Sequence, residues 1–599
     1  MKFVKNSLTY LASPILALLI LATFFQLWNC DLSKPVFGYG QDALFHIFII
    51  KTIVSSGWFF QNDFVGYPHI SGSFFFQDFP IHADSFNFLI VKIFSYFSSD
   101  VFLITNYFFI FTFSLIAFTS FIALRAFNIS IVTAIAISLL YAFTPYHLAR
   151  NVLHLFLSNY AAIPLVIMVA LWLATSKIQL LILNEKGRFE FAPNRFFFIS
   201  FIVAIFVATN GAYYASYSCV IFVFAWFLRG LKKGSFLDCQ AFNLVVLCSI
   251  ILLTLLILYF PSFIYWSNNG FNKEVANRDP SSSEYYALHI IDLFLPIANH
   301  YLNYLSKLHL IFDEALVGWE RDAENLGILA SVGFIFLLLW MFAKSQNSEN
   351  SFIQKTIKKL SLNEDEKNLI SNLAGLNLLV VLFATVGGLV MFVALPFPLL
   401  RSHARFCIFL AFFSLFVVGI IFDKIARDRA IAKFLIIAVT ILALLDQVGK
   451  IDVARRDVMQ NNFNIDHDFV AKIEANMAPN SQIFILPVFG FPEEVGDEYE
   501  SLVFYLHSQN LRWSYPAILG RPTNLWQKEV LKLDKKNFIS ELKKAGFSGI
   551  AIDRMHFTRK EKEKKNEWQK LRALEKSLDA LSKEKPITSR DMKFVFFKI

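Results

Sequence analysis

A polar motif, GQDALFH, interrupts an otherwise apolar region near the start of the chain. Its acid, Asp42, and its histidine, His46, are four residues apart and would share one face of a helix. This spacing suits a hydrogen-bonded pair or two ligands of one cation, and a carboxylate at the mouth of a membrane cavity can act as a general base. The structural alternative is that Asp42 caps the apolar helix expected at 43–60, which would lie along the membrane surface.

A second polar motif, FFFQDFPIHADSF, follows in the same region and contains Asp78, His82 and Asp84. Two acids and a histidine among phenylalanines favour either a cation or the hydroxyl groups of a sugar as the bound species. The structural alternative is again a cap, because Asp84 and Ser85 directly precede a segment with the pattern of a helix.

Cationic side chains recur in three other polar segments, and guanidinium groups match the geometry of phosphate oxygens. The residues are His147, Arg150 and His154 in TPYHLARNVLH, Arg401 and Arg405 in RSHARF, and Arg278 with the acid Glu284 in NRDPSSSEYYALHIIDLFLP. The first three are spaced i, i+3 and i+7, which predicts one stripe along a helix. Arginines outside a membrane need a negative partner, so a lipid-linked phosphate, lipid headgroups or Asp42 itself are the alternatives.

Long apolar runs must position these side chains. The 599 residues are 56% hydrophobic and only 17% charged, with a mean hydropathy of +0.52. These values indicate a polytopic helical membrane protein. Eleven runs are predicted to cross the membrane, at 9–29, 101–125, 129–146, 152–176, 195–209, 211–230, 241–264, 324–344, 371–397, 402–422 and 431–447.

Lysine and arginine residues concentrate in alternate loops, which predicts a cytoplasmic N-terminus. The net charge of +9 then needs no nucleic-acid partner. All the polar motifs fall on the outer side, the first of them in a long outer loop at 31–100. Residues 1–450 are predicted to form the membrane domain. Residues 451–599 are predicted to form a small extracytoplasmic α/β domain with strands in SQIFILPV, FSGIAIDR and MKFVFFKI.

An aromatic cluster in YLHSQNLRWSYPAILGR, within the C-terminal region, is predicted to face the membrane domain. Trp513 could stack on a sugar ring, with Arg521 beside it as a further substrate contact. The alternative is that these residues belong to the core of the domain.

Several strings together resemble the GT-C superfamily of membrane glycosyltransferases, and more closely a bacterial family of sugar translocases and transferases within it. They are GQDALFH, TPYHLARNVLHLFLSNY, NGAYY, NRDPSSSEYYALHIIDLFLP, LRSHARF, LHSQNLRWSYPAILGR and AGFSGIAIDR, and they span nearly the whole chain. The resemblance implies a polyprenyl-phosphate-linked sugar donor and transfer on the non-cytoplasmic side. It implies that Asp42 deprotonates the acceptor or holds a metal, that Asp78 and Asp84 form a second acidic station, and that Arg401 and Arg405 bind the donor phosphate.

The predicted function is therefore an inverting glycosyltransferase that acts on a glycan or lipid acceptor. The alternative is a non-enzymatic translocase of lipid-linked sugars. The sequence contains neither a Walker loop nor GxGxxG, so no nucleotide site is predicted. No cofactor is required by the pattern. A DxD motif is absent, which leaves a divalent cation at Asp42 and Asp84 as an open alternative.

Overall fold

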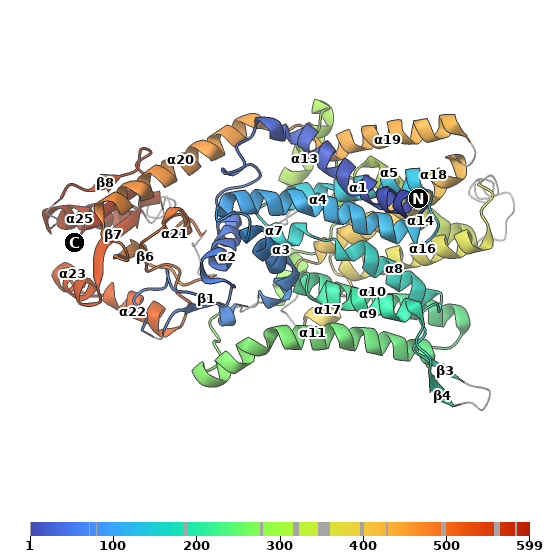
Figure 1. Cartoon of the computed structure of the whole chain (residues 1–599), viewed down its shortest axis with the longest axis horizontal. Coiled ribbons are helices and arrows are strands. Elements are labelled where there is room, and N and C mark those ends of the chain that lie inside the picture. Colours follow the sequence, from blue (N-terminus) through green and yellow to red (C-terminus); the bar gives the residue numbers. More distant parts are fainter. Residues whose placement is uncertain are drawn as a thin grey trace.

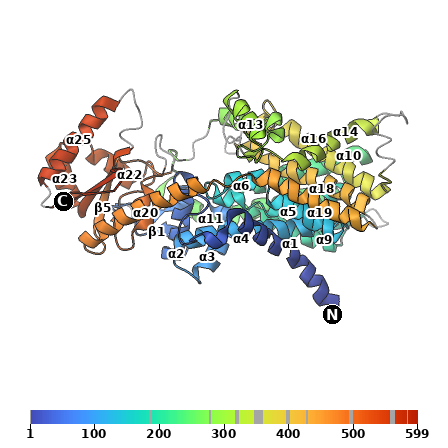
Figure 2. The ribbon, with the colours of Figure 1, turned by 90° about the horizontal axis from the view of Figure 1, so that it is seen from above.

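The chain forms two parts, a long helical bundle and a smaller domain that contains a β-sheet (Figure 1). The computed structural model describes the whole chain except residues 1, 71, 80, 184–187, 276–278, 316–322, 346–359, 396–400, 427–428, 493–498, 556–563 and 582–583. Figure 2 shows the two parts from a second direction, with α20 (Val453–Asn476) running between them. We call the end of the bundle that meets the sheet domain the domain-side end.

Apolar helices build the bundle, one for each predicted span. They are α1 (Lys2–Phe25), α4 (Val101–Arg125), α5 (Ile131–Ala142), α8 (Ala162–Ala174), α9 (Arg195–Ala208), α10 (Ala212–Lys233), α11 (Cys239–Asn269), α14 (Ile328–Ser345), α16 (Glu364–Ala384), α18 (Cys407–Ala426) and α19 (Ala430–Val448). The described residues contain seven helical stretches that are long and apolar enough to cross a membrane. The predicted membrane class is thus confirmed. The helix α8 covers only residues 162–174 of the run predicted at 152–176.

Small residues let the helices of the bundle approach closely. A Cβ atom added at Gly333 of α14 would lie 2.3 Å from the carbonyl oxygen of Ser414 in α18, so these two backbones are in direct contact. Ser13 of α1 and Ser138 of α5 share a hydrogen bond of 2.5 Å between their hydroxyl groups. Close backbones and paired hydroxyls are the usual means of helix association where water is absent.

The first loop folds against the domain-side end of the bundle. It contains η1 (Leu27–Asn29), α2 (Asp42–Ser56), β1 (Gln61–Asn62), β2 (Phe74–Phe75), η2 (Phe76–Asp78), η3 (His82–Asp84) and α3 (Ser85–Ser95). Nine residues of α2 are buried, because it packs against α3 and α4 on one side and against α21 (Leu502–His507) of the sheet domain on the other. These contacts hold α2 between the bundle and the sheet domain.

Short elements connect the remaining helices. They are α6 (Pro145–Arg150), α7 (Leu155–Ser158), α12 (Ser281–Tyr285), η4 (Ile290–Phe294), α13 (Asn303–Ala315), α17 (Met391–Ala394) and η6 (His403–Phe406), and an antiparallel hairpin of β3 (Leu181–Leu183) and β4 (Phe189–Phe191). In Figure 1 the hairpin lies at the end of the bundle opposite the sheet domain.

The C-terminal domain is built on a five-stranded sheet with the order β6-β5-β7-β9-β8. The strands are β5 (Gln482–Leu486), β6 (Arg512–Trp513), β7 (Phe547–Asp553), β8 (Ile587–Thr588) and β9 (Phe594–Lys598), and the further helices are α22 (Pro522–Val530), α23 (Lys535–Lys544) and α25 (Lys564–Leu581). β5 is parallel to β6 and β7, whereas β9 is antiparallel to β7 and β8. The three predicted strands are β5, β7 and β9, and the predicted α/β character is confirmed.

Candidate active site

Asp42 lies in the first turn of α2 at the domain-side end. Its Oδ2 is 3.6 Å from Nδ1 of His154, and half of its side chain is exposed. Gln41, with a φ of 50°, occupies the N-cap position, so the interpretation of Asp42 as the cap is wrong. The carboxylate is therefore held beside an imidazole and remains accessible to a substrate.

His46 is not the partner of Asp42 that the spacing predicted. Its ring packs edge-on against Phe156 at a centroid distance of 5.0 Å, and it hydrogen-bonds to the backbone of Leu153. Burial lowers the pKa of His46 to about 3, which keeps the ring neutral. The histidine that contacts Asp42 is His154, which comes from a segment more than 100 residues away.

The predicted stripe of His147, Arg150 and His154 is interrupted. α6 ends at Arg150, and Asn151 has a φ of 33°, so His154 lies beyond the helix. His147 is buried in the core, where its ring stacks on Phe113 and its nitrogens contact the Ala142 carbonyl at 2.8 Å and the Thr112 hydroxyl at 2.9 Å. Because both nitrogens are occupied, the prediction that His147 binds substrate is wrong.

The three described arginines of the predicted set all lie over tyrosine rings at the domain-side end. Arg150 is 5.1 Å from the ring of Tyr146, Arg405 is 4.4 Å from Tyr213, and Arg401 is 5.2 Å from Tyr286. Arg150 and Arg405 are buried, and both sit over flat aromatic faces that are favourable for a cation. We call these three arginines and their tyrosines the arginine–tyrosine cluster.

Hydrogen bonds join the elements that carry the arginine–tyrosine cluster. The Tyr146 hydroxyl is 3.1 Å from that of Tyr214 in α10, and the Ala404 amide donates to the Tyr286 carbonyl at 3.1 Å. Both carboxylate oxygens of Glu284 share the single N–H of Gly387, at 2.9 and 3.1 Å. This contact gives Glu284 a structural role in the turn at Gly387. Arg278 lies outside the described residues.

Asp84 lies where the first loop meets the turn before α10. The Gly211 amide donates to the Ala83 carbonyl at 2.9 Å, and Asn87 donates to Asp84 at 3.3 Å. Burial raises the pKa of Asp84 to about 7, so this carboxyl group exchanges its proton near neutral pH. The carboxylate does not cap α3, since its side chain makes no capping bond there.

His82 is fully buried beside Asp84, among the rings of Phe59, Phe60 and Tyr259. Burial lowers its pKa to about 4. Neither ring nitrogen has a hydrogen-bond partner among the described residues. The ring is closed off from solvent by these aromatic neighbours, so the surroundings of His82 do not support its prediction as a substrate contact.

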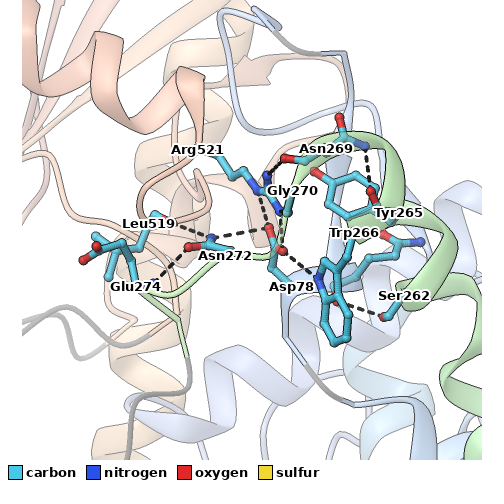
Figure 3. A network of polar contacts seen from close by, with 11 residues as sticks. Asp78, Ser262, Tyr265, Trp266, Asn269, Gly270, Asn272, Glu274, Leu519 and Arg521 are labelled. Atoms are coloured by element: carbon cyan, nitrogen blue, oxygen red, sulfur yellow. Dashed lines mark hydrogen bonds and ion pairs between the residues drawn. The ribbon is translucent and has the colours of Figure 1, made fainter.

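Asp78 and Arg521 meet in a buried network that ties the first loop to the C-terminal domain (Figure 3). Arg521 donates from Nε to Oδ2 at 2.6 Å and from Nη2 to Oδ1 at 2.7 Å, and Trp266 of α11 donates to Oδ1 at 3.0 Å. Only 1% of the Asp78 side chain is exposed. All three elements are thus locked at one carboxylate, and the prediction that Asp78 and Arg521 contact substrate is replaced by a structural role.

Trp513 faces the membrane-bound part of the chain, as predicted, but as a core residue. Its side chain is fully buried and stacks on Phe504, and its amide donates to the Phe64 carbonyl of the first loop at 2.9 Å. The prediction that it stacks on a sugar is wrong, because no face of the ring is accessible.

A cavity of about 440 Å³ reaches Gln41, the residue before Asp42. It is lined by residues 36–41, by Asn151 and Leu153 next to Arg150 and His154, and by Arg455 of α20. Arg456 and Glu500 also contribute to its wall. These three charged residues could not be predicted from the sequence, since they lie in helical or loop segments with ordinary surface composition.

Tyr39 fixes the segment that precedes Asp42. Its hydroxyl donates to Oδ2 of Asp466 at 2.7 Å and is 2.8 Å from Nε2 of His507. Both partners belong to the C-terminal domain, so this domain positions the start of α2. Within the described ranges, no group of three or more His, Cys, Asp or Glu side chains is arranged to hold a metal ion, and Asp42 and Asp84 each have protein neighbours instead.

Asp466 makes the folded state sensitive to pH. Burial raises the pKa of this carboxyl group from 3.8 to about 7, although Lys593 and the Tyr39 hydrogen bond oppose the increase and Glu500 adds to it. Between about pH 4 and pH 7 the folded chain therefore keeps a proton that the unfolded chain releases. The free energy of unfolding should fall as the pH rises through this range.

We expect Asp466→Asn to flatten this decrease, because asparagine can still accept the Tyr39 bond but has no proton to lose. Thermal melting of the purified chain in detergent at pH 4.5, 5.5, 6.5 and 7.5 measures the slope. Asp468→Asn, on the same helix and partly exposed, is the control and should keep the wild-type slope. Equal slopes for the two variants would contradict the role of Asp466.

The apolar bundle and the sheet domain together define a polytopic helical membrane protein with a small C-terminal α/β domain. No protein-family model matches this chain, and no curated protein matches it.

Solved structures of the oligosaccharyltransferase AglB from the archaeon Archaeoglobus fulgidus are similar in arrangement. The complex with an inhibitory peptide and a dolichol-phosphate is 11% identical, covers 91% of this chain and 69% of AglB, and has a TM-score of 0.39. The apo form is 12% identical with the same coverage and a TM-score of 0.38. The complex with zinc and sulfate is 13% identical, covers 90% and 68%, and has a TM-score of 0.37.

Proposed function

We propose that this chain is a membrane glycosyltransferase that moves a sugar from a polyprenyl-phosphate-linked donor to a glycan or lipid acceptor on the non-cytoplasmic side. The observation that carries the proposal is an accessible carboxylate, Asp42, beside a cavity at the same end of the bundle as the arginine–tyrosine cluster. A base and a phosphate-binding cluster are the two components that such a transfer needs.

In the proposed step, Asp42 takes the proton of an acceptor hydroxyl group. The hydroxyl oxygen forms a bond to the anomeric carbon of the donor sugar from the face opposite the phosphate. The bond between that carbon and the phosphate oxygen breaks, and its electron pair leaves with the polyprenyl phosphate. The configuration at the anomeric carbon is inverted. His154 orients the carboxylate through the 3.6 Å contact.

The arginine–tyrosine cluster stabilises the leaving phosphate in this proposal. Negative charge grows on the phosphate oxygens as the bond breaks, and positioned cations stabilise such charge most strongly where water is excluded. Arg150 and Arg405 are buried and are held in place by their tyrosines, so little reorganisation is needed. Arg401 is more exposed and is suited to the first contact with the donor.

The proposed orientation places the domain-side end outside a bacterial inner membrane. Arg125 and Lys424 lie near the ends of α4 and α18 that face away from the C-terminal domain, and Lys232 and Lys233 end α10 on the same side. Cationic residues gather on the cytoplasmic side of membrane proteins, which supports this orientation.

Incubation of the purified chain with a panel of polyprenyl-phosphate sugars tests the function, with released polyprenyl phosphate as the readout. We expect release from at least one donor in the presence of acceptor extract. We also expect Arg401→Ala to raise the KM for that donor by about 10- to 100-fold, since a charge-assisted hydrogen bond contributes about 1.5–3 kcal/mol.

Arg512→Ala is the matched control for Arg401→Ala. Arg512 also lies over an aromatic ring, 4.2 Å from Phe64, but belongs to β6 and not to the cluster. Its KM should equal that of the wild type. Movement of intact donor across proteoliposomes without release from any member of the panel would instead support a translocase and overturn the transferase proposal.

A further inference from the structure

A second cavity, of about 730 Å³, is lined by His507, which contacts Tyr39 in the wall of the first cavity. The first loop, α2, the start of α4, α20 and the end of α21 all contribute to its wall. It therefore lies at the junction between the bundle and the C-terminal domain, outside the apolar helices. Its volume is in the range typical of sites for small organic ligands.

Two aromatic rings and two imidazoles form one wall of this junction cavity. Phe102 and Phe463 meet edge to face at 4.7 Å. His507 stacks on Phe102 at 5.4 Å with an interplanar angle of 21°, and His467 is nearly parallel to Phe463. Aromatic side chains next to hydrogen-bonding imidazoles are a lining that suits a sugar, whose C–H groups pack on aromatic rings while its hydroxyls need polar partners.

The charged groups of the cavity favour an anion. Lys34 and Lys51 line it together with one acid, Asp100. Asp100 is the N-cap of α4, where its carboxylate accepts hydrogen bonds from the amides of Phe102 and Leu103 at 2.9 and 3.1 Å. Its charge is thus largely committed to the helix terminus, whereas Lys34 sits at the partly exposed rim.

Lys51 is fixed in the wall by three backbone carbonyls. Its ammonium group donates to Tyr505 at 2.6 Å, Leu506 at 3.0 Å and Ser508 at 2.6 Å, which are the carbonyls at the end of α21. Burial lowers the pKa of Lys51 to about 7. An anion bound nearby would favour the charged form of this lysine, so ligand binding and protonation would support each other.

One histidine connects the junction cavity to the proposed catalytic segment. His507 lines the cavity, and its Nε2 is the atom that contacts the Tyr39 hydroxyl at 2.8 Å. Tyr39 lines the first cavity and precedes Asp42 by three residues. A ligand that packs against His507 would therefore contact the residue that holds Tyr39, and so the segment that precedes Asp42.

We propose that the junction cavity binds an anionic saccharide, such as a uronic acid unit, as a remote part of the acceptor glycan. The identification of this saccharide as part of the acceptor rests on the proposed function. Its binding in the cavity does not depend on catalysis. Binding through a remote unit would align the reacting hydroxyl group with Asp42 and tighten the Tyr39 segment.

Titration calorimetry on the full chain in detergent, without donor, tests the site with tetragalacturonate and with neutral maltotetraose as probes. We expect tetragalacturonate to bind at least about 10-fold more tightly. Lys34→Glu should bind tetragalacturonate about 10-fold or more weakly than the wild type does. His467→Ala should bind both probes more weakly. Lys472→Glu, an exposed charge reversal on α20 outside the cavity, is the control and should bind like the wild type.

Equal affinity for the two probes, or unchanged binding by Lys34→Glu in a folded chain, would overturn the proposal. The two proposals fail separately. Asp42→Asn should bind tetragalacturonate normally while losing transfer. Release of polyprenyl phosphate by a wild-type chain that binds neither probe would refute the junction site and leave the glycosyltransferase proposal standing.

Discussion

Asp42→Asn is expected to slow sugar transfer by at least about 100-fold while leaving the yield of folded protein unchanged. A positioned general base typically contributes about 10²–10⁴-fold, and asparagine has the same shape as aspartate but cannot take a proton. The substitution should not affect folding, because half of the Asp42 side chain is exposed and asparagine can keep the contact with His154. Single-turnover release of polyprenyl phosphate measures the effect, and size-exclusion chromatography measures the yield.

Two matched variants define what the result means. Asp31→Asn removes an exposed acid of the same loop, whose carboxylate accepts hydrogen bonds from the amide and the hydroxyl of Ser33, and it should transfer at the wild-type rate. Asp84→Asn should cause a smaller loss than Asp42→Asn. If Asp84→Asn abolished transfer and Asp42→Asn did not, the base would be Asp84, and if both stayed active the proposed mechanism would be wrong.

Asp78→Ala is expected to destabilise the chain by about 3–5 kcal/mol. The substitution leaves the Arg521 guanidinium without its carboxylate in a largely buried site, and breaking a buried pair by removing one member has this cost. Arg521→Ala should have a similar effect for the same reason. Thermal or denaturant unfolding of the detergent-purified chain is the measurement.

The double variant separates an ion pair from two unrelated losses. Asp78→Ala with Arg521→Ala should be destabilised by clearly less than the sum of the single variants, because neither leaves the other charge unpaired. The exposed pair of Lys532 and Glu529, at 2.5 Å, provides the control cycle, and its coupling should be below about 1 kcal/mol. Additive effects at Asp78 and Arg521 would contradict a stabilising ion pair between them.

The sequence predicted what depends on local composition. Apolar runs marked all eleven bundle helices, and β-branched runs marked β5, β7 and β9. It also placed Asp42 and the arginines in polar segments that the structure brings to one end of the bundle. Each of these features follows from hydrophobicity or spacing within a short window.

What the sequence did not predict depends on contacts between distant segments. His46 and His154 are equally polar in the sequence, but only the fold decides which one contacts Asp42. Trp513 is an aromatic residue in a polar segment, and its burial follows from the first loop packing over it. The pairing of Tyr39 with Asp466 joins residues 427 positions apart, which no local pattern can indicate.

The ion pair between Asp78 and Arg521 also constrains the order of events during synthesis and folding. Asp78 and Arg521 are 443 positions apart, so Asp78 is added to the growing chain long before Arg521. At about 5–20 residues per second, the first loop waits roughly 20–90 s for its counter-charge. During that interval the Asp78 carboxylate lacks its arginine and must stay hydrated. The indole of Trp266 is the partner that is synthesised earlier. Closure of the first loop is therefore one of the last events in the assembly of this membrane protein, after the final span has been inserted.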